Sequence, residues 1–87
     1  MMQCNVKITN ASGLHARPAA NVMKEAKRYK ADIRIVKGER TGNAKSLVEI
    51  LTLDISCGDV VSVSCSGENE EEALRAMKRI MENNFES

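Results

Sequence analysis

The stretch Gly13-Leu14-His15-Ala16-Arg17-Pro18-Ala19-Ala20 joins the first predicted strand of the chain to its first predicted helix. Gly13 permits a backbone turn that other residues resist. Pro18 is tolerated in the first turn of a helix, where its missing N–H costs nothing, and the alanines after it are strong helix formers. His15 is therefore expected at or beside a helix N-terminus, where unpaired N–H groups and the helix dipole attract anions.

His15 is the only histidine of the chain, and Arg17 follows it two residues later. The arginine offers a planar cationic fork that suits phosphate. The positive end of the dipole disfavours imidazolium and so keeps a ring nitrogen free to attack. These features predict a histidine that carries a phosphoryl group. From position and residue type alone, the alternative stays open that His15 is a surface or capping residue and Arg17 a solvated one.

Helical spacing of small and apolar residues predicts a first helix from about Ala16 to Tyr29, able to pack close to a sheet. A residue before proline avoids the helical region. Regular helix therefore begins either at Pro18 or, against the preference of Arg17, at Ala16.

Alternating apolar and polar residues predict the strands of a half-buried sheet. The first two strands are Met2–Ile8 and Asp32–Val36, and a turn at Lys37-Gly38-Glu39 leads to a third, Arg40–Asn43. Gly42 weakens the third strand and suggests an edge or a bulge. Residues Val61–Cys65 form the fourth.

Two more helices are predicted from their capping signals. Ser46 and Glu49 form a capping box before a short helix that ends near Leu53, and Asn69 with Glu72 caps the last helix. The apolar residues of the short helix do not share one face, so one or two are expected to be exposed. An exposed Leu47 or Val48 beside His15 would make a docking patch, and the alternative is that all belong to the core.

Composition excludes several classes of protein. The chain has 87 residues, which predicts a single domain spanning 1–87, and its net charge of +1 gives no electrostatic case for binding nucleic acid. With one Tyr and one Phe, a base-stacking surface is not expected. The three cysteines lack disulfide or zinc spacing, and no cofactor or metal is expected. No signal peptide or membrane span is found, so a cytoplasmic protein is predicted.

The sequence closely resembles the HPr family, the histidine-containing phosphocarriers of the bacterial phosphoenolpyruvate-dependent sugar phosphotransferase system. The resemblance covers essentially the whole chain. It is carried by three motifs in register: Gly13-Leu14-His15-Ala16-Arg17-Pro18-Ala19, then Ala44-Lys45-Ser46-Leu47, then Gly67-Glu68 before an acidic helix start. It implies an α+β open-faced β-sandwich in the order β-α-β-β-α-β-α, with a four-stranded antiparallel sheet of order 1-4-2-3 and three helices on one face.

The resemblance also implies a function and its residues. His15 would accept a phosphoryl group through Nδ1 from enzyme I and pass it to sugar-specific IIA domains, and Arg17 would stabilise the phosphoryl charge. Ser46 matches a serine that a dedicated kinase modifies in many relatives. Further candidate partners are that HPr kinase/phosphorylase and a transcriptional regulator. A monomeric protein is expected, and its partner-binding residues would be Ala16, Ala20, Leu47, Val48 and Leu51.

The sequence departs from the family pattern at Asp54, where glycine is common, at Gly42, where an apolar residue is usual, and at Asn69, where aspartate is common. The first departure raises the question of a strained turn. A second hypothesis is a regulatory interaction protein that acts through Ser46 with His15 idle. A generic nucleic-acid or metal-binding module of similar topology is disfavoured by the missing aromatics, basic patch and ligand clusters.

Overall fold

The computed structural model describes residues 1–9 and 16–82. Along the chain the elements alternate between strands and helices in the predicted order, β-α-β-β-α-β-α. Their bounds are β1 (Met2–Lys7), α1 (Ala16–Ala26), β2 (Asp32–Lys37), β3 (Arg40–Asn43), α2 (Leu47–Thr52), β4 (Val60–Ser66) and α3 (Glu70–Glu82).

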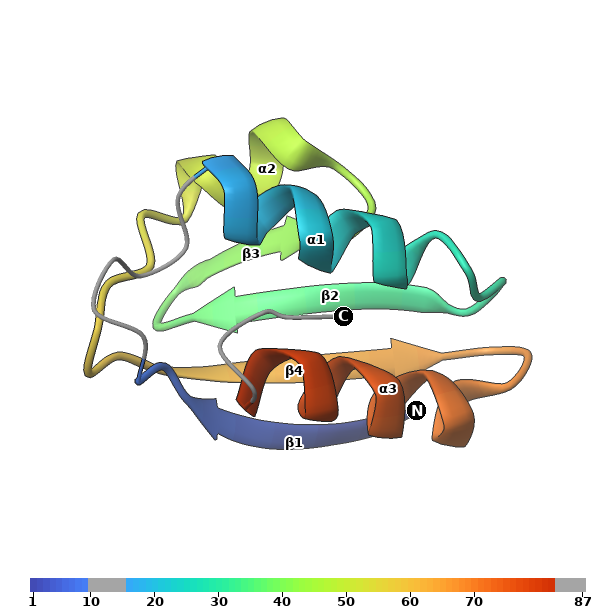
Figure 1. Cartoon of the computed structure of the whole chain (residues 1–87). Coiled ribbons are helices and arrows are strands. Elements are labelled where there is room, and N and C mark those ends of the chain that lie inside the picture. Colours follow the sequence, from blue (N-terminus) through green and yellow to red (C-terminus); the bar gives the residue numbers. More distant parts are fainter. Residues whose placement is uncertain (10–15, 83–87) are drawn as a thin grey trace.

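The four strands form one antiparallel sheet in the order β1-β4-β2-β3 (Figure 1), as predicted. The chain therefore starts at one edge strand and places β3 at the other. Register is fixed by the alternation of the sequence: Val63 of β4 lies between Cys4 of β1 and Ile35 of β2, so apolar side chains meet on one face. A slip of one residue would turn all of them to solvent.

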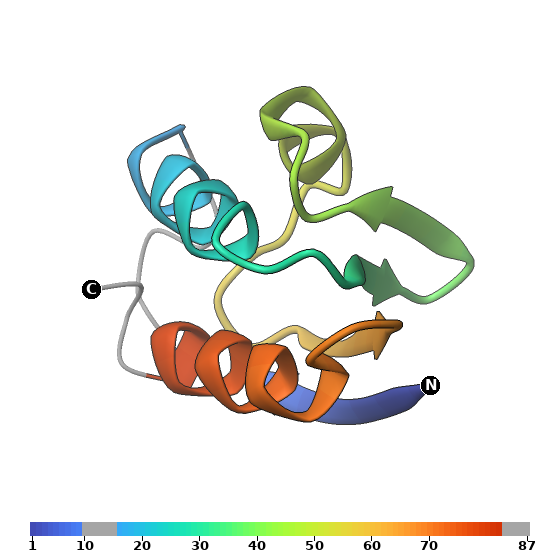
Figure 2. The ribbon, with the colours of Figure 1, turned by 90° about the vertical axis from the view of Figure 1, so that its right-hand side faces the viewer.

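All three helices cover this one face, and the other face of the sheet is left open (Figure 2). The core between the two layers is entirely apolar in the described part of the chain, with Ile8, Ile33, Ile35, Ile50 and Met77 among its largest fully buried side chains. Helices α1 and α3 each contribute a stripe of buried residues at helical spacing to this core, and α2 contributes Ile50. Across residues 1–9 and 16–82, no helix combines the length and apolar character needed to cross a membrane.

The first helix starts at Ala16, so Arg17 is helical although proline follows it. Of the two predicted starts, the one at Pro18 is wrong. Regular helix ends at Ala26 rather than near Tyr29, because the N–H of Arg28 bonds to the carbonyl of Glu25 and tightens the last turn. The predicted cap of α3 is wrong too: Asn69 has a φ of 60°, unlike the extended backbone of an N-cap residue.

Two of the three departures from the family pattern, those at Asp54 and Gly42, have local explanations. Asp54 adopts a φ of 52°, in the left-handed region where glycine is usual and where aspartate is tolerated better than most residues. The ammonium of Lys37 donates to its carbonyl oxygen. Gly42 is buried on edge strand β3, and a Cβ there would lie 3.1 Å from the carbonyl oxygen of Glu49 and 3.2 Å from Leu53 Cδ1. The glycine therefore lets α2 pack directly on β3.

We predict that Gly42→Val destabilises the protein by about 1–3 kcal/mol, because the added side chain must push α2 away from β3. Urea unfolding measures this change. The neighbouring Thr41→Val, at an exposed position of the same strand, is the matched control and should stay within about 0.5 kcal/mol of the parent. Equal stability of the two variants would contradict the close-packing explanation.

Candidate functional site

The candidate site involves α1 and α2, and the two helices pack against each other on the covered face of the sheet (Figure 2). His15 itself lies outside the described residues. The site is therefore described from the first turn of α1, which follows His15 in sequence, from α2, and from the end of β1.

The first turn of α1 is open to solvent. Ala16 and Arg17 are exposed, and Ala20, one turn further along, is half-buried. This turn contains no acidic residue. In the described part of the chain no carboxylate pairs with Arg17 either. An exposed guanidinium at the positive end of a helix, with no counter-ion among the described residues, is available to a phosphate.

Ser46 is the N-cap of α2, as the sequence predicts. Its backbone is extended, with φ −116° and ψ 114°, and its hydroxyl oxygen accepts the N–H of Glu49 at 3.4 Å. The reciprocal half of the predicted capping box is absent: the Glu49 carboxylate accepts the N–H of Asn43 at 3.0 Å, and the N–H of Ser46 donates to the Asn43 carbonyl. The side chain of Glu49 thus joins α2 to β3 instead of closing on its own helix.

Lys45 makes two contacts that the sequence patterns did not reveal. Its ammonium donates to the carbonyl oxygen of Tyr29 at 2.6 Å, and its backbone N–H donates to Asn43 Oδ1 at 2.9 Å. The lysine thereby joins the start of α2 to the segment that follows α1. A lysine in a turn is usually solvated. Only the structure shows that the Lys45 ammonium lies against the Tyr29 carbonyl, 16 residues away in sequence.

The apolar residues of α2 divide between core and surface. Ile50 is fully buried and Leu47 packs against the core from a partly buried position. Val48 is 73% exposed and Leu51 is 40% exposed. The expectation that one or two apolar residues are exposed is confirmed. The open alternative in which all of them are buried is excluded.

The end of β1 is held by the turn Ser56–Asp59. The N–H of Gly58 donates to the Ile8 carbonyl at 2.7 Å, and the N–H of Ile8 donates to the Asp59 carbonyl at 2.8 Å. The Asp59 carboxylate accepts the N–H of Ser56 at 2.8 Å and pairs with Lys37 at 3.1 Å. These contacts fix the last described residues before the Gly13–Ala20 junction.

The same contacts lower the pKa of Asp59 below its ordinary value of 3.8, first through the hydrogen bond from Ser56 and then through Lys37. A carboxyl whose pKa is lower in the folded state stabilises the fold above its unfolded pKa. That contribution is lost as the pH falls through the folded pKa. Acid should therefore weaken the contacts of the Asp59 carboxylate that hold the turn at the end of β1.

We predict that Asp59→Asn lowers the free energy of unfolding at about pH 7 and that the deficit shrinks towards about pH 2.5. Urea unfolding across this range measures the difference from the parent. Asp54→Asn is the control, because the contact to Asp54 is made by its backbone carbonyl and not its carboxylate. A deficit for Asp59→Asn that is constant with pH would show that its carboxylate charge is not responsible.

Comparison with known proteins identifies the pattern. Residues 2–83 match the family model described as the PTS HPr component phosphorylation site. A Buchnera aphidicola protein named phosphocarrier protein HPr is 43% identical over 81 residues, which cover 93% of this chain and 95% of that protein.

Solved structures agree in backbone as well as in sequence. The crystal structure of HPr from Thermoanaerobacter tengcongensis matches with a TM-score of 0.94 and 39% identity, covering 98% of this chain and 96% of the other. The phosphocarrier protein HPr from Bacillus anthracis matches with a TM-score of 0.88 and 40% identity, covering 92% and 95%.

Proposed function

Since the chain belongs to the HPr family, the bacterial phosphocarriers of the phosphotransferase system, we propose that His15 is the residue that carries the phosphoryl group. Proteins of this family hold the group on a histidine and are carriers rather than enzymes. One observation carries the assignment: the only histidine of the chain directly precedes the exposed first turn of α1. A sole histidine leaves no competing acceptor of its type.

The transfer needs a neutral imidazole as the nucleophile. Nδ1 of His15 attacks the phosphorus, the N–P bond forms, and the bond from phosphorus to the donor histidine of enzyme I breaks as that imidazole leaves. The guanidinium of Arg17 stabilises the negative charge of the phosphoryl oxygens, together with the N–H groups of the first turn of α1. The reverse sense of the same chemistry delivers the group to a IIA domain. The chain would do this in the cytoplasm.

The family implies enzyme I and IIA domains as partners. Both would dock on one surface formed by Ala16, Ala20, Leu47, Val48 and Leu51, around the reactive histidine. The exposure of Val48 and Leu51 supports this, because removing apolar side chains from water under a partner lowers the free energy of the complex. Leu47 would contribute mainly by supporting the other two from below.

We predict that His15→Ala abolishes phosphoryl uptake from enzyme I and phosphoenolpyruvate, while Arg17→Gln slows uptake at least about tenfold, because a charge-assisted contact to the transferred group is lost. Uptake is followed with radiolabelled phosphoenolpyruvate in single-turnover time courses. Arg34→Gln, which removes an exposed arginine from β2, is the matched control with an unchanged rate. Normal uptake by His15→Ala would refute the assignment.

Ser46 is proposed as a regulatory phosphorylation site on the same surface. The support from the structure is its place as N-cap of α2 beside the exposed Val48. A phosphate adds a charge of about −1.5 to −2, and the backbone N–H groups at the start of α2 can donate hydrogen bonds to its oxygens. The fold is therefore expected to keep its stability, while a partner that covers Val48 must desolvate the new charge.

We predict that Ser46-phosphorylated protein accepts phosphoryl from enzyme I more slowly than the unmodified form, with an unchanged or higher melting temperature. Ser46→Asp carries less charge and should change the rate in the same direction by a smaller factor. Parallel uptake assays and thermal melts separate the two effects. Equal uptake rates would exclude a switch on this transfer, and a collapsed melting temperature would indicate unfolding as the cause.

A further inference from the structure

A second polar site lies at the opposite end of α1. A pocket of about 360 Å³ opens between Tyr29, just past the end of α1, and α3, where it is lined by Glu72, Arg75, Ala76 and Arg79. We call it the α3 pocket. The eleven residues of α1 separate it from the first turn by about 16 Å of helix. It is therefore distinct from the surface proposed for phosphoryl transfer.

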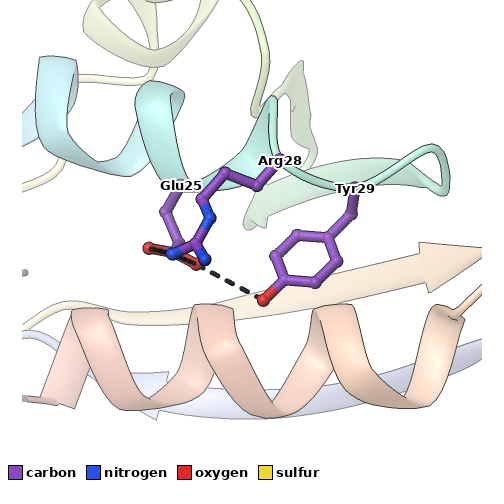
Figure 3. Close-up of polar contacts among 3 residues, drawn as sticks. All are labelled: Glu25, Arg28 and Tyr29. Atoms are coloured by element: carbon purple, nitrogen blue, oxygen red, sulfur yellow. Dashed lines mark hydrogen bonds and ion pairs between the residues drawn. The ribbon is translucent and has the colours of Figure 1, made fainter.

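The wall formed by Tyr29 is fixed in two places. Its hydroxyl donates to the Glu25 carboxylate at 3.4 Å, and its carbonyl oxygen accepts the ammonium of Lys45 at 2.6 Å. Figure 3 shows the ring lying between the end of α1 and α3, with the hydroxyl turned towards Glu25 and Arg28. The Glu25 carboxylate pairs with Arg28 at 3.4 Å, and among the described residues it forms no ion pair with an arginine of α3. The aromatic face is thus presented in one orientation.

The α3 wall carries charge of both signs in a fixed order. Glu72, Arg75, Ala76 and Arg79 are spaced three and four residues apart and so share one face of the helix. Arg75 pairs with Glu71 at 2.9 Å, but both groups are largely exposed, and such a pair contributes little. Within residues 1–9 and 16–82, no carboxylate pairs with Arg79. Two guanidinium groups are therefore available on either side of the small Ala76.

We propose that the α3 pocket binds a small organic phosphate that also carries hydroxyl groups. Arg75 and Arg79 present the forked donors that bind phosphate oxygens bidentately. Glu72 lies seven residues before Arg79, about 10 Å along the helix, and its carboxylate accepts hydroxyl donors at the far end of the ligand. The carbon chain lies against the Tyr29 ring and Ala76. The volume is within the range of small-molecule sites.

The test uses glycerol 3-phosphate as the probe, with inorganic phosphate and glycerol as comparisons, at constant ionic strength. Two-dimensional NMR follows the Nε–H signals of Arg75 and Arg79 and the backbone amides of Tyr29 and Ala76. Saturable shifts with a Kd on the order of millimolar are expected for glycerol 3-phosphate, with weaker binding of inorganic phosphate. No saturation below about 50 mM, or shifts confined to Ala16–Ala19, would overturn the proposal.

Variants assign the shifts to the pocket. Arg79→Gln should weaken binding at least about tenfold, because it removes a charged hydrogen bond, whereas Arg34→Gln on β2 should not change it. Glu72→Gln should narrow the preference for glycerol 3-phosphate over inorganic phosphate. Equal affinity of the Arg79 and Arg34 variants would overturn the proposal. Arg79→Gln should accept phosphoryl from enzyme I at the parent rate, so this result is separate from the carrier function.

Discussion

A sheet of four strands with only one apolar face dictates the arrangement of everything else in this protein. Because polar residues alternate with apolar ones in β1, β2 and β4, only one side of the sheet can bury side chains, and all three helices must share it. Three helices on one side of a small sheet must pack against one another. This packing places α2, which begins 31 residues after the start of α1 in sequence, directly against α1.

Small contacts then set how closely the helices approach. The absence of a side chain at Gly42 lets α2 rest on β3, and Lys45 joins α2 to the segment after α1. Both contacts help to position the start of α2, which carries Ser46 and Val48. The turn that ends at Asp59 has the same role for the end of β1. These contacts between elements therefore fix the position of the surface proposed for phosphoryl transfer.

Much of this could be predicted from the sequence because alternation and helical spacing are local signals. The strands and the apolar core follow from these signals, the cap at Ser46 follows from its capping-box motif, and the order of the strands was implied by the family resemblance. The misses are all long-range or conformational. The side chain of Glu49 bonds to β3 rather than to its own cap, and Asn69 has a left-handed backbone. No local pattern states which distant carbonyl a lysine such as Lys45 will find.

The site itself was predicted unequally. Arg17 and Val48 are exposed as their proposed roles require, whereas Leu47 is turned largely to the core because α2 is too short to spare all its apolar residues from packing. The functional reading of His15 rests on its sequence context, since it lies outside the described residues. The α3 pocket had no sequence signal, because its walls come from α3 and from Tyr29 in the segment after α1, and they depend on the orientation of the Tyr29 ring.

The central claim is that this chain is a carrier with one phosphoryl group on one histidine. Mass spectrometry of the intact protein after incubation with enzyme I and phosphoenolpyruvate tests it most directly, followed by fragmentation at neutral pH. The account predicts one added phosphoryl group, located on the peptide that contains His15 and lost on brief treatment with acid. No added mass, or an acid-stable group on another residue, would contradict it.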